Sequence, residues 1–237
     1  MKKFYIISCH VLWRELCYFA STSKNAFNFH FLKQGLHDTP DILRKQVQDA
    51  IDGVDGDYDA ILIGYGLCSN GLVDIQARDK KLVIMRGHDC ITFLLGSKDR
   101  YQQYFDRHPG TYWYSPGWID TTLMPSKEKL DKIFQQYKEK YGEENAEYLM
   151  QIEQHWIHDY SNAAYVDLGF YDTQEYKEYT KKCALELSWH YDELTGDPQL
   201  IMNFLEGNWN SDNFLIVQPG EKVIASHDER IIEAQKT

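Results

Sequence analysis

The stretch KLVIMRGHDCITFLLGS, from Lys81 to Ser97, decides how the fold of this chain is interpreted. It opens with a short apolar run, Leu82 to Met85, which is typical of a buried strand. The run then changes at once to RGHDC, residues 86 to 90. A guanidinium, an imidazole, a carboxylate and a thiol therefore follow directly after a predicted strand. This pattern indicates a strand that delivers reactive side chains into a loop.

The same order of residues occurs twice more in the chain. Asp59 to Ile63 (DAILI) precedes a glycine-rich loop that contains Cys68, and Phe4 to Ile7 precedes Cys9. Parallel strands of an open α/β sheet end along one edge, and the loops leaving that edge line the crevice in which such folds bind ligands. We therefore expect Cys9, Cys68 and Cys90 to lie near one another.

The order of elements predicts an α/β fold with a mostly parallel, doubly wound sheet and helices on both faces. The strands are apolar runs without clean alternation, which is typical of a sheet covered on both sides. We expect one α/β domain over residues 1–237, in which two lobes could meet near residues 110–165. A long helix is predicted over residues 172–194, and a polar tail that frays over residues 226–237.

Composition and charge narrow the classes of function. The chain has 237 residues, 43% of them hydrophobic and 26% charged, which is typical of a globular protein. Its net charge of −11 argues against nucleic acid or a membrane surface as a partner, and favours a small-molecule ligand or a protein partner. No apolar run reaches the roughly 20 residues that cross a bilayer. The N-terminal apolar run is interrupted by charges, and the five cysteines lack regular spacing, so we expect a cytoplasmic protein.

The three strand-end cysteines, Cys9, Cys68 and Cys90, are candidate metal ligands. Three thiolates with one open coordination position suit zinc or an iron-sulfur cluster. Their spacing differs from the local CxxC pairs of structural zinc sites. The alternative interpretation is that each is a small buried apolar residue. Cys17 and Cys183 lie inside helical patterns and are assigned to packing.

Four further residues are candidates for binding a cofactor or ligand at this edge: His37, Arg86, His88 and Trp118. Either histidine could complete a metal shell, act as a general base or orient a ligand. Arg86 could bind an anionic group or hold a thiolate in its charged form, or instead form an ion pair with Asp38 or Asp89. Trp118 ends an aromatic segment that could reach over the cysteines.

Two other functions use the same residues. One is a binding module without chemistry, in which the crevice holds a tetrapyrrole-like or other small ligand between aromatic walls. The other takes Cys90 or Cys68 as a nucleophile and His88 as its base, and needs no metal. The sequence alone leaves all of these functions open, and it assigns no reaction.

Several short motifs occur in a fixed order along the chain: QGLHD at 34–38, GYGLC at 64–68, RGHDCI at 86–91, LGS at 95–97, GTY at 110–112 and PGW at 116–118. Together they resemble an uncharacterised family, numbered sixteen thirty-eight among the domains of unknown function and found mainly in anaerobic archaea and bacteria. Met85 stands where the resemblance leads us to expect proline.

The resemblance implies a single cytoplasmic domain in an anaerobic setting. It also implies a loose association with corrinoid-dependent methyl metabolism. Zinc bound by thiolates or an iron-sulfur centre would suit the chemistry of that metabolism. A corrinoid contact, or a protein of a corrinoid pathway as partner, is expected on the same ground.

Overall fold

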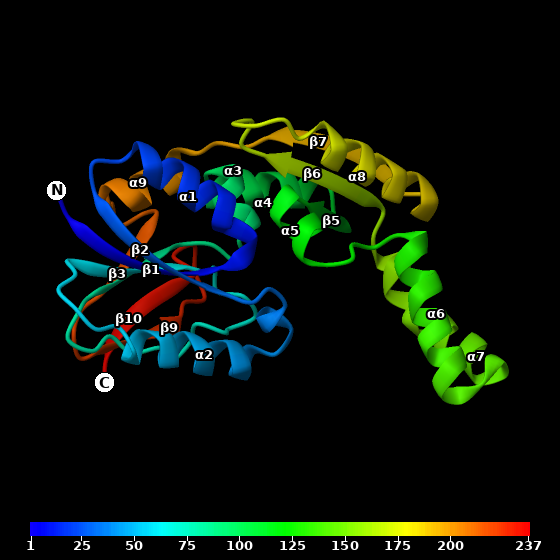
Figure 1. Cartoon of the computed structure of the whole chain (residues 1–237), viewed down its shortest axis with the longest axis horizontal. Helices are drawn as coiled ribbons and strands as arrows, with labels where there is room; N and C mark the ends of the chain where they lie inside the picture. The colour runs from blue at the N-terminus through cyan, green and yellow to red at the C-terminus, as the bar shows by residue number, and fades with distance from the viewer. The chain divides into compact units, whose positions relative to one another are not determined.

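The computed structural model describes residues 1–237, the side chain of Glu153 excepted. The chain divides into two compact units (Figure 1). The first consists of residues 1–101 and 196–237, and the second of residues 102–195. The second unit is therefore one continuous segment, placed between the two parts that build the first.

A five-stranded sheet with the strand order β2-β1-β3-β4-β8 forms the centre of the first unit. Its strands are β1 (Lys3–Cys9), β2 (Ala26–Leu32), β3 (Ala60–Gly64), β4 (Leu82–Met85) and β8 (Phe214–Val217). The first four run parallel, and β8 runs antiparallel to β4. Every residue of β3 and β4 is buried, as their apolar runs indicate. The predicted α/β fold with a mostly parallel sheet is confirmed.

Helices cover both faces of this sheet. They are η1 (His10–Leu12), α1 (Trp13–Thr22), η2 (Leu36–Asp38), α2 (Pro40–Asp52), α3 (Ile91–Leu95) and α9 (Gln199–Glu206), and α4 (Lys98–Arg107) begins in this unit. Figure 1 shows α1 and α9 on one face and α2 on the other. Right-handed crossovers in opposite directions produce this arrangement, because β1 leads to β2 on one side and β2 leads back past β1 to β3.

The C-terminal residues form a hairpin of β9 (Glu221–Ala225) and β10 (Ile232–Lys236). The predicted fraying of the polar tail over residues 226–237 is therefore wrong for its second half, which forms a paired strand. Ile231 and Ile232 are buried, and the guanidinium of Arg86 donates hydrogen bonds to the carbonyls of Arg230 and Ile232. Two isoleucines and a distant arginine hold a strand whose own sequence is mostly polar.

The second unit contains a three-stranded parallel sheet with the order β5-β6-β7. Its elements are β5 (Thr111–Tyr114), α5 (Pro116–Thr121), α6 (Lys127–Tyr141), α7 (Glu143–Glu153), η3 (His155–Asp159), β6 (Asn162–Asp167), α8 (Gln174–Leu187) and β7 (His190–Thr195). The central strand β6 is buried throughout, and its Tyr165 belongs to an aromatic cluster that also includes Tyr114 of β5 and Trp189.

The predicted helix over residues 172–194 is wrong at its C-terminal end. Helix α8 stops at Leu187 because Ser188 adopts a left-handed conformation with φ of 58°, and β7 follows from His190. No residue of β7 is fully buried, since the strand lies at the edge of its sheet. None of the described helices is long and apolar enough to cross a membrane.

Candidate functional site

The strand order of the first sheet identifies the edge at which a ligand is expected. The chain moves from β1 to β2 in one direction and then returns to β3 in the other, so the reversal lies between β1 and β3. Open α/β sheets bind ligands outside the carboxyl ends of their strands at this point. Cys9 is the last residue of β1, while Cys68 and Cys90 lie in the loops after β3 and β4.

The three thiols gather around one side chain, that of Tyr65. Burial is the main cause that raises the pKa of the Tyr65 phenol, and Cys9, Cys68 and Cys90 all lie close enough to raise it further. Cys9 also raises the pKa of Cys68. The structure therefore brings together the three cysteines that the sequence places at separate strand ends.

Backbone hydrogen bonds join the two loops that carry Cys68 and Cys90. The amide of Leu67 donates to the carbonyl of Gly87 at 2.8 Å, and the amide of Cys68 donates to the carbonyl of His88 at 2.9 Å. A Cβ on Gly66 would lie 2.8 Å from both the backbone N and the Cα of Asp89. Only glycine fits at position 66 while the loops approach this closely.

The loop after β3 is held in an unusual backbone conformation. Cys68, Ser69 and Asn70 have φ angles of 45°, 56° and 67°, so three successive residues other than glycine are left-handed. Each such residue costs roughly 1–2 kcal/mol relative to the right-handed conformation. Strain of this kind is concentrated at binding sites, where surrounding contacts hold it in place.

Burial makes the thiols poor acids. It raises the pKa of Cys9, although backbone amides and the neighbouring Tyr65 hydroxyl oppose the rise. It also raises the pKa of Cys68, where the carboxylate of Asp89 adds to the effect. Cys9 and Cys68 are therefore neutral thiols at neutral pH when no cation is bound.

Tyr65 is 3% exposed. Its hydroxyl interacts with the Cys9 thiol, and among the described residues it makes no hydrogen bond of ordinary geometry. A neutral thiol is a weak acceptor, so this buried hydroxyl is poorly satisfied. This hydroxyl is therefore the group best placed to donate to an additional acceptor among the thiols.

Asp89 is a half-buried carboxylate fixed beside Cys68. Its Oδ1 accepts hydrogen bonds from the amides of Ile91 at 3.0 Å and Thr92 at 3.3 Å, which caps α3. Its Oδ2 accepts from the Tyr101 hydroxyl at 3.0 Å. Burial nevertheless raises the pKa of Asp89.

The two candidate histidines lie in loops at the same edge. His88 is exposed and directly precedes Asp89 and Cys90. His37 lies in η2, in the connection after β2, and its Nε2 is 3.3 Å from Oδ1 of Asp38. Both remain predicted ligand-binding residues.

Arg86 is directed toward the C-terminal part of the first unit. Its Nε donates to the carbonyl of Ser211 at 2.9 Å, in addition to the two bonds to the hairpin described above. Burial lowers its pKa, and the acidic residues that oppose this are Glu233, Asp228 and Asp212, in place of the expected Asp38 or Asp89. The geometry thus gives Arg86 a structural role.

Trp118 belongs to α5 of the second unit, where it is partly buried against the aromatic cluster. Cys183, on α8, is buried within that cluster, and Cys17 lies on α1. These two cysteines lie in helices, as the sequence predicts.

The thiols are not arranged as a finished metal site. Across the part of the chain that the structure describes, no three or more Cys, His, Asp or Glu side chains lie close enough together to hold a metal ion. A shared ion would therefore require the sulfur atoms to move closer to one another.

Sequence reasoning missed Tyr65 and Tyr101. A signal for Tyr65 was present, since a tyrosine between two glycines directly after a buried strand is an unusual use of a large side chain. Tyr101 gave no such signal, because its approach to Asp89 depends on the turn between α3 and α4.

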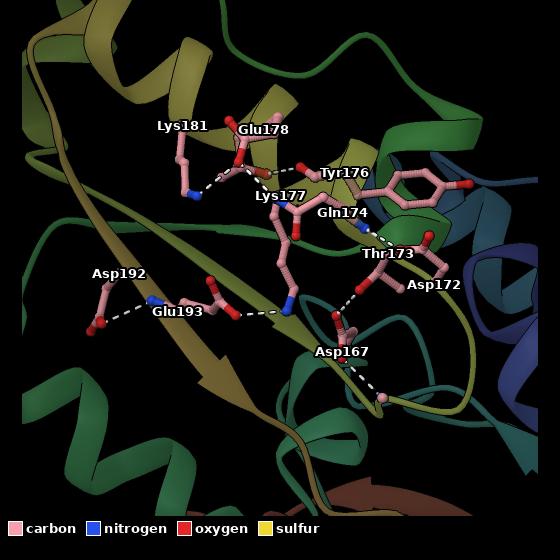
Figure 2. Close-up of polar contacts among 12 residues, drawn as sticks. Asp167, Asp172, Thr173, Gln174, Tyr176, Lys177, Glu178, Lys181, Asp192 and Glu193 are labelled. Carbon is pink, nitrogen blue, oxygen red and sulfur yellow. Dashed lines mark hydrogen bonds and ion pairs between the residues drawn. The ribbon is translucent and has the colours of Figure 1, made fainter.

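A second polar cluster lies at the carboxyl end of β6 (Figure 2). Asp167 accepts hydrogen bonds from the amide of Gly169 at 2.8 Å and the hydroxyl of Thr173 at 2.6 Å. Lys177 of α8 forms an ion pair with Glu193 of β7 at 2.7 Å. These contacts pair the charged groups with one another and fix the loop before α8, so we assign them to structure.

Comparison with known proteins gives one family. No curated protein and no solved structure matches the chain. A family model described as "Protein of unknown function (DUF1638)" matches residues 31–205, which is more than half of the chain and includes Cys68 and Cys90 but not Cys9. The chain belongs to this family, DUF1638.

Proposed function

We propose that this protein binds a metal centre, zinc or an iron-sulfur cluster, through the thiolates of Cys9, Cys68 and Cys90. One observation supports the proposal above the others: three thiols from three adjacent parallel strands surround one buried tyrosine at the edge where such sheets bind ligands. Thiolates are the side chains that these metals prefer.

The raised thiol pKa values favour a metal over a cysteine nucleophile. A nucleophilic cysteine reacts as its thiolate, and such sites lower the thiol pKa with nearby positive charge. Here burial raises the pKa of Cys9 and Cys68, and an acidic residue adjoins Cys68. A bound metal ion would instead lower the pKa of these thiols, because a thiol that coordinates a metal loses its proton outright.

The surrounding residues have definite tasks in this proposal. The Cys68 loop would bring its sulfur toward Cys9 and Cys90, the Tyr65 hydroxyl would donate to a thiolate, and His37 or His88 would supply a further ligand. Zinc would supply Lewis-acid activation of a thiol or water, whereas a cluster would supply electron transfer.

We further propose anaerobic, corrinoid-linked methyl metabolism as the setting, with a corrinoid or a protein of that pathway as the partner. This part rests on the family resemblance and not on a contact in the structure. The competing function is a module without chemistry that binds a small ligand or a tetrapyrrole in the same crevice.

Metal analysis with an absorption spectrum, on protein purified without oxygen, tests the proposal. We expect stoichiometric metal in the native chain, its loss in Cys68→Ser, and its retention in the control Cys17→Ser, which changes a half-buried thiol on α1. Zinc with a featureless visible spectrum would indicate Lewis-acid chemistry, and iron with broad visible absorption a cluster. Absence of both, with no effect of Cys68→Ser, would reject the metal centre and favour the ligand-binding module.

A further inference from the structure

Helices α6 and α7 form a two-helix arm within the second unit. Gly142 alone joins them, with φ of 82°. Figure 1 shows the two helices side by side, extending away from the sheet of their own unit. Such a hairpin has neighbours along only part of its length.

The apolar side chains of the arm are poorly covered. Helix α6 carries an apolar stripe at helical spacing, but no residue of α6 is buried. The stripe consists of Leu130, Ile133, Phe134, Tyr137 and Tyr141. Two helices alone cannot enclose a core, and four helices are the common solution.

The arm has a groove and, apart from it, two exposed apolar side chains on α7. Leu130 and Phe134 of α6, both half-buried, and the buried Met150 of α7 line the groove, together with Asp131, Glu147, Gln151 and Gln154. On α7, Tyr148 and Ile152 are one helical turn apart and are 64% and 57% exposed. Large apolar side chains gathered in this way are typical of an interaction surface.

The charges on the two helices are opposite in sign. Helix α6 has five lysines and three carboxylates, whereas α7 has four glutamates and no basic residue. Within the arm, one described ion pair joins Lys138 to Glu143, at 2.7 Å. Lys132, Glu144 and Glu147 are exposed, and Nζ of the exposed Lys140 lies 4.9 Å from the centroid of the Tyr141 ring.

We propose that this arm binds the same arm of a second copy of the chain, with α6 of each copy against α7 of the other. A two-fold axis makes such a contact self-complementary. Contact between two α7 helices would oppose glutamates to glutamates, whereas the crossed contact opposes lysines to glutamates. The product is a four-helix bundle that buries the apolar stripe on α6 of both copies.

The mass of the full-length chain in solution, measured by light scattering and sedimentation over a range of concentrations, tests this. We expect a dimer. The double variant Tyr148→Glu with Ile152→Glu should raise its dissociation constant by about tenfold or more, because each arm then buries charge in its apolar contact. The control Leu185→Glu changes an 82% exposed apolar residue on α8 and should leave the dimer unchanged.

An exchange of charges separates this contact from a general loss of stability. One variant carries Lys132→Glu with Lys140→Glu, and the other Glu144→Lys with Glu147→Lys. Each alone should dimerise more weakly than the native chain, and an equal mixture should form the mixed dimer. A native chain that remains monomeric at all concentrations would overturn the proposal and leave the groove to a helix of another protein. A dimer unaffected by the arm variants would overturn it equally.

Discussion

Tyr65 places a phenol hydroxyl among three sulfur atoms and away from water. The hydroxyl can donate to a thiolate but has little to gain from a neutral thiol, which accepts hydrogen bonds weakly. Deprotonation of one thiol and satisfaction of the Tyr65 hydroxyl therefore favour each other. The residue is suited to stabilise the charged, ligand-bound form of the site.

At this scale we predict slow alkylation of Cys68 in the metal-free chain. Burial and Asp89 raise its pKa, so little thiolate is present at about pH 7 and the rate should keep increasing above pH about 8.5, the ordinary thiol value. Mass spectrometry of the iodoacetamide-treated chain measures this, and the urea-unfolded chain is the control. Rapid labelling of Cys68 at neutral pH would instead support the cysteine nucleophile.

The same pKa shift predicts how stability depends on pH. A thiol whose pKa is higher in the folded state binds its proton more tightly there, so its contribution is complete below the unfolded pKa of about 8.5 and is lost as pH rises through the folded value. The free energy of unfolding of the metal-free chain should therefore fall more steeply above pH about 8.5 than that of Cys68→Ser. Urea titrations at several pH values make the comparison, and parallel curves would contradict it.

Arg86 is predicted to matter for stability. Arg86→Met removes the donors to the carbonyls of Ser211, Arg230 and Ile232, and should cost about 3 kcal/mol, since bonds from charged donors are worth roughly 1.5–3 kcal/mol each and are not additive. Urea unfolding measures the loss. Arg107→Met, at an exposed position, should stay within about 0.5 kcal/mol of the native chain. An unchanged unfolding curve for Arg86→Met would refute the structural role.

At the scale of elements, the apolar runs at 59–63 and 82–85 were sufficient to predict β3 and β4, because central parallel strands are apolar on both faces. The approach of Cys9, Cys68 and Cys90 followed from strand direction alone. Strands β7 and β10 were missed because they lie at sheet edges and carry mostly polar residues. The direction of the Arg86 side chain could not be predicted, because it depends on contacts with the C-terminal hairpin.

The contact between the loops after β3 and β4 predicts a strong effect of one methyl group. Gly66→Ala places a Cβ 2.8 Å from the backbone of Asp89 and should destabilise the fold by about 2 kcal/mol, as overpacking does. Gly53→Ala is the control, because its nearest neighbour lies at 3.3 Å and its φ is ordinary, so its effect should stay within about 1 kcal/mol. Equal stabilities in urea would show that the loops separate easily.

At the scale of the whole molecule, the first unit depends on both ends of the chain. Strand β8 pairs with β4, and the amide of Asp197 donates to the carbonyl of Leu94 at 2.9 Å. The chain therefore leaves the first unit, and later returns to it, at neighbouring positions. The sequence predicts one domain with lobes meeting near 110–165, whereas the units divide at residues 101 and 195.

A truncated chain tests this dependence. Removal of residues 213–237 deletes β8 and the hairpin, uncovers the edge of β4 and leaves the Arg86 guanidinium with one of its three carbonyl partners, that of Ser211. We expect aggregation, because an uncovered apolar edge strand pairs with other chains. Solubility and light scattering measure it, and a chain shortened only by Lys236 and Thr237 is the control. A soluble truncated chain with a cooperative transition would contradict the expectation.

The position of β8 late in the chain also sets an order of events during protein synthesis. The second unit emerges from the ribosome whole, before the last strand of the first unit exists. Domains generally fold in the order in which they are made. Here the second unit can complete its core before β8, the strand that pairs with β4, has been made. The three cysteines, all made within the first 90 residues, therefore exist long before the strand that completes the sheet beside β4.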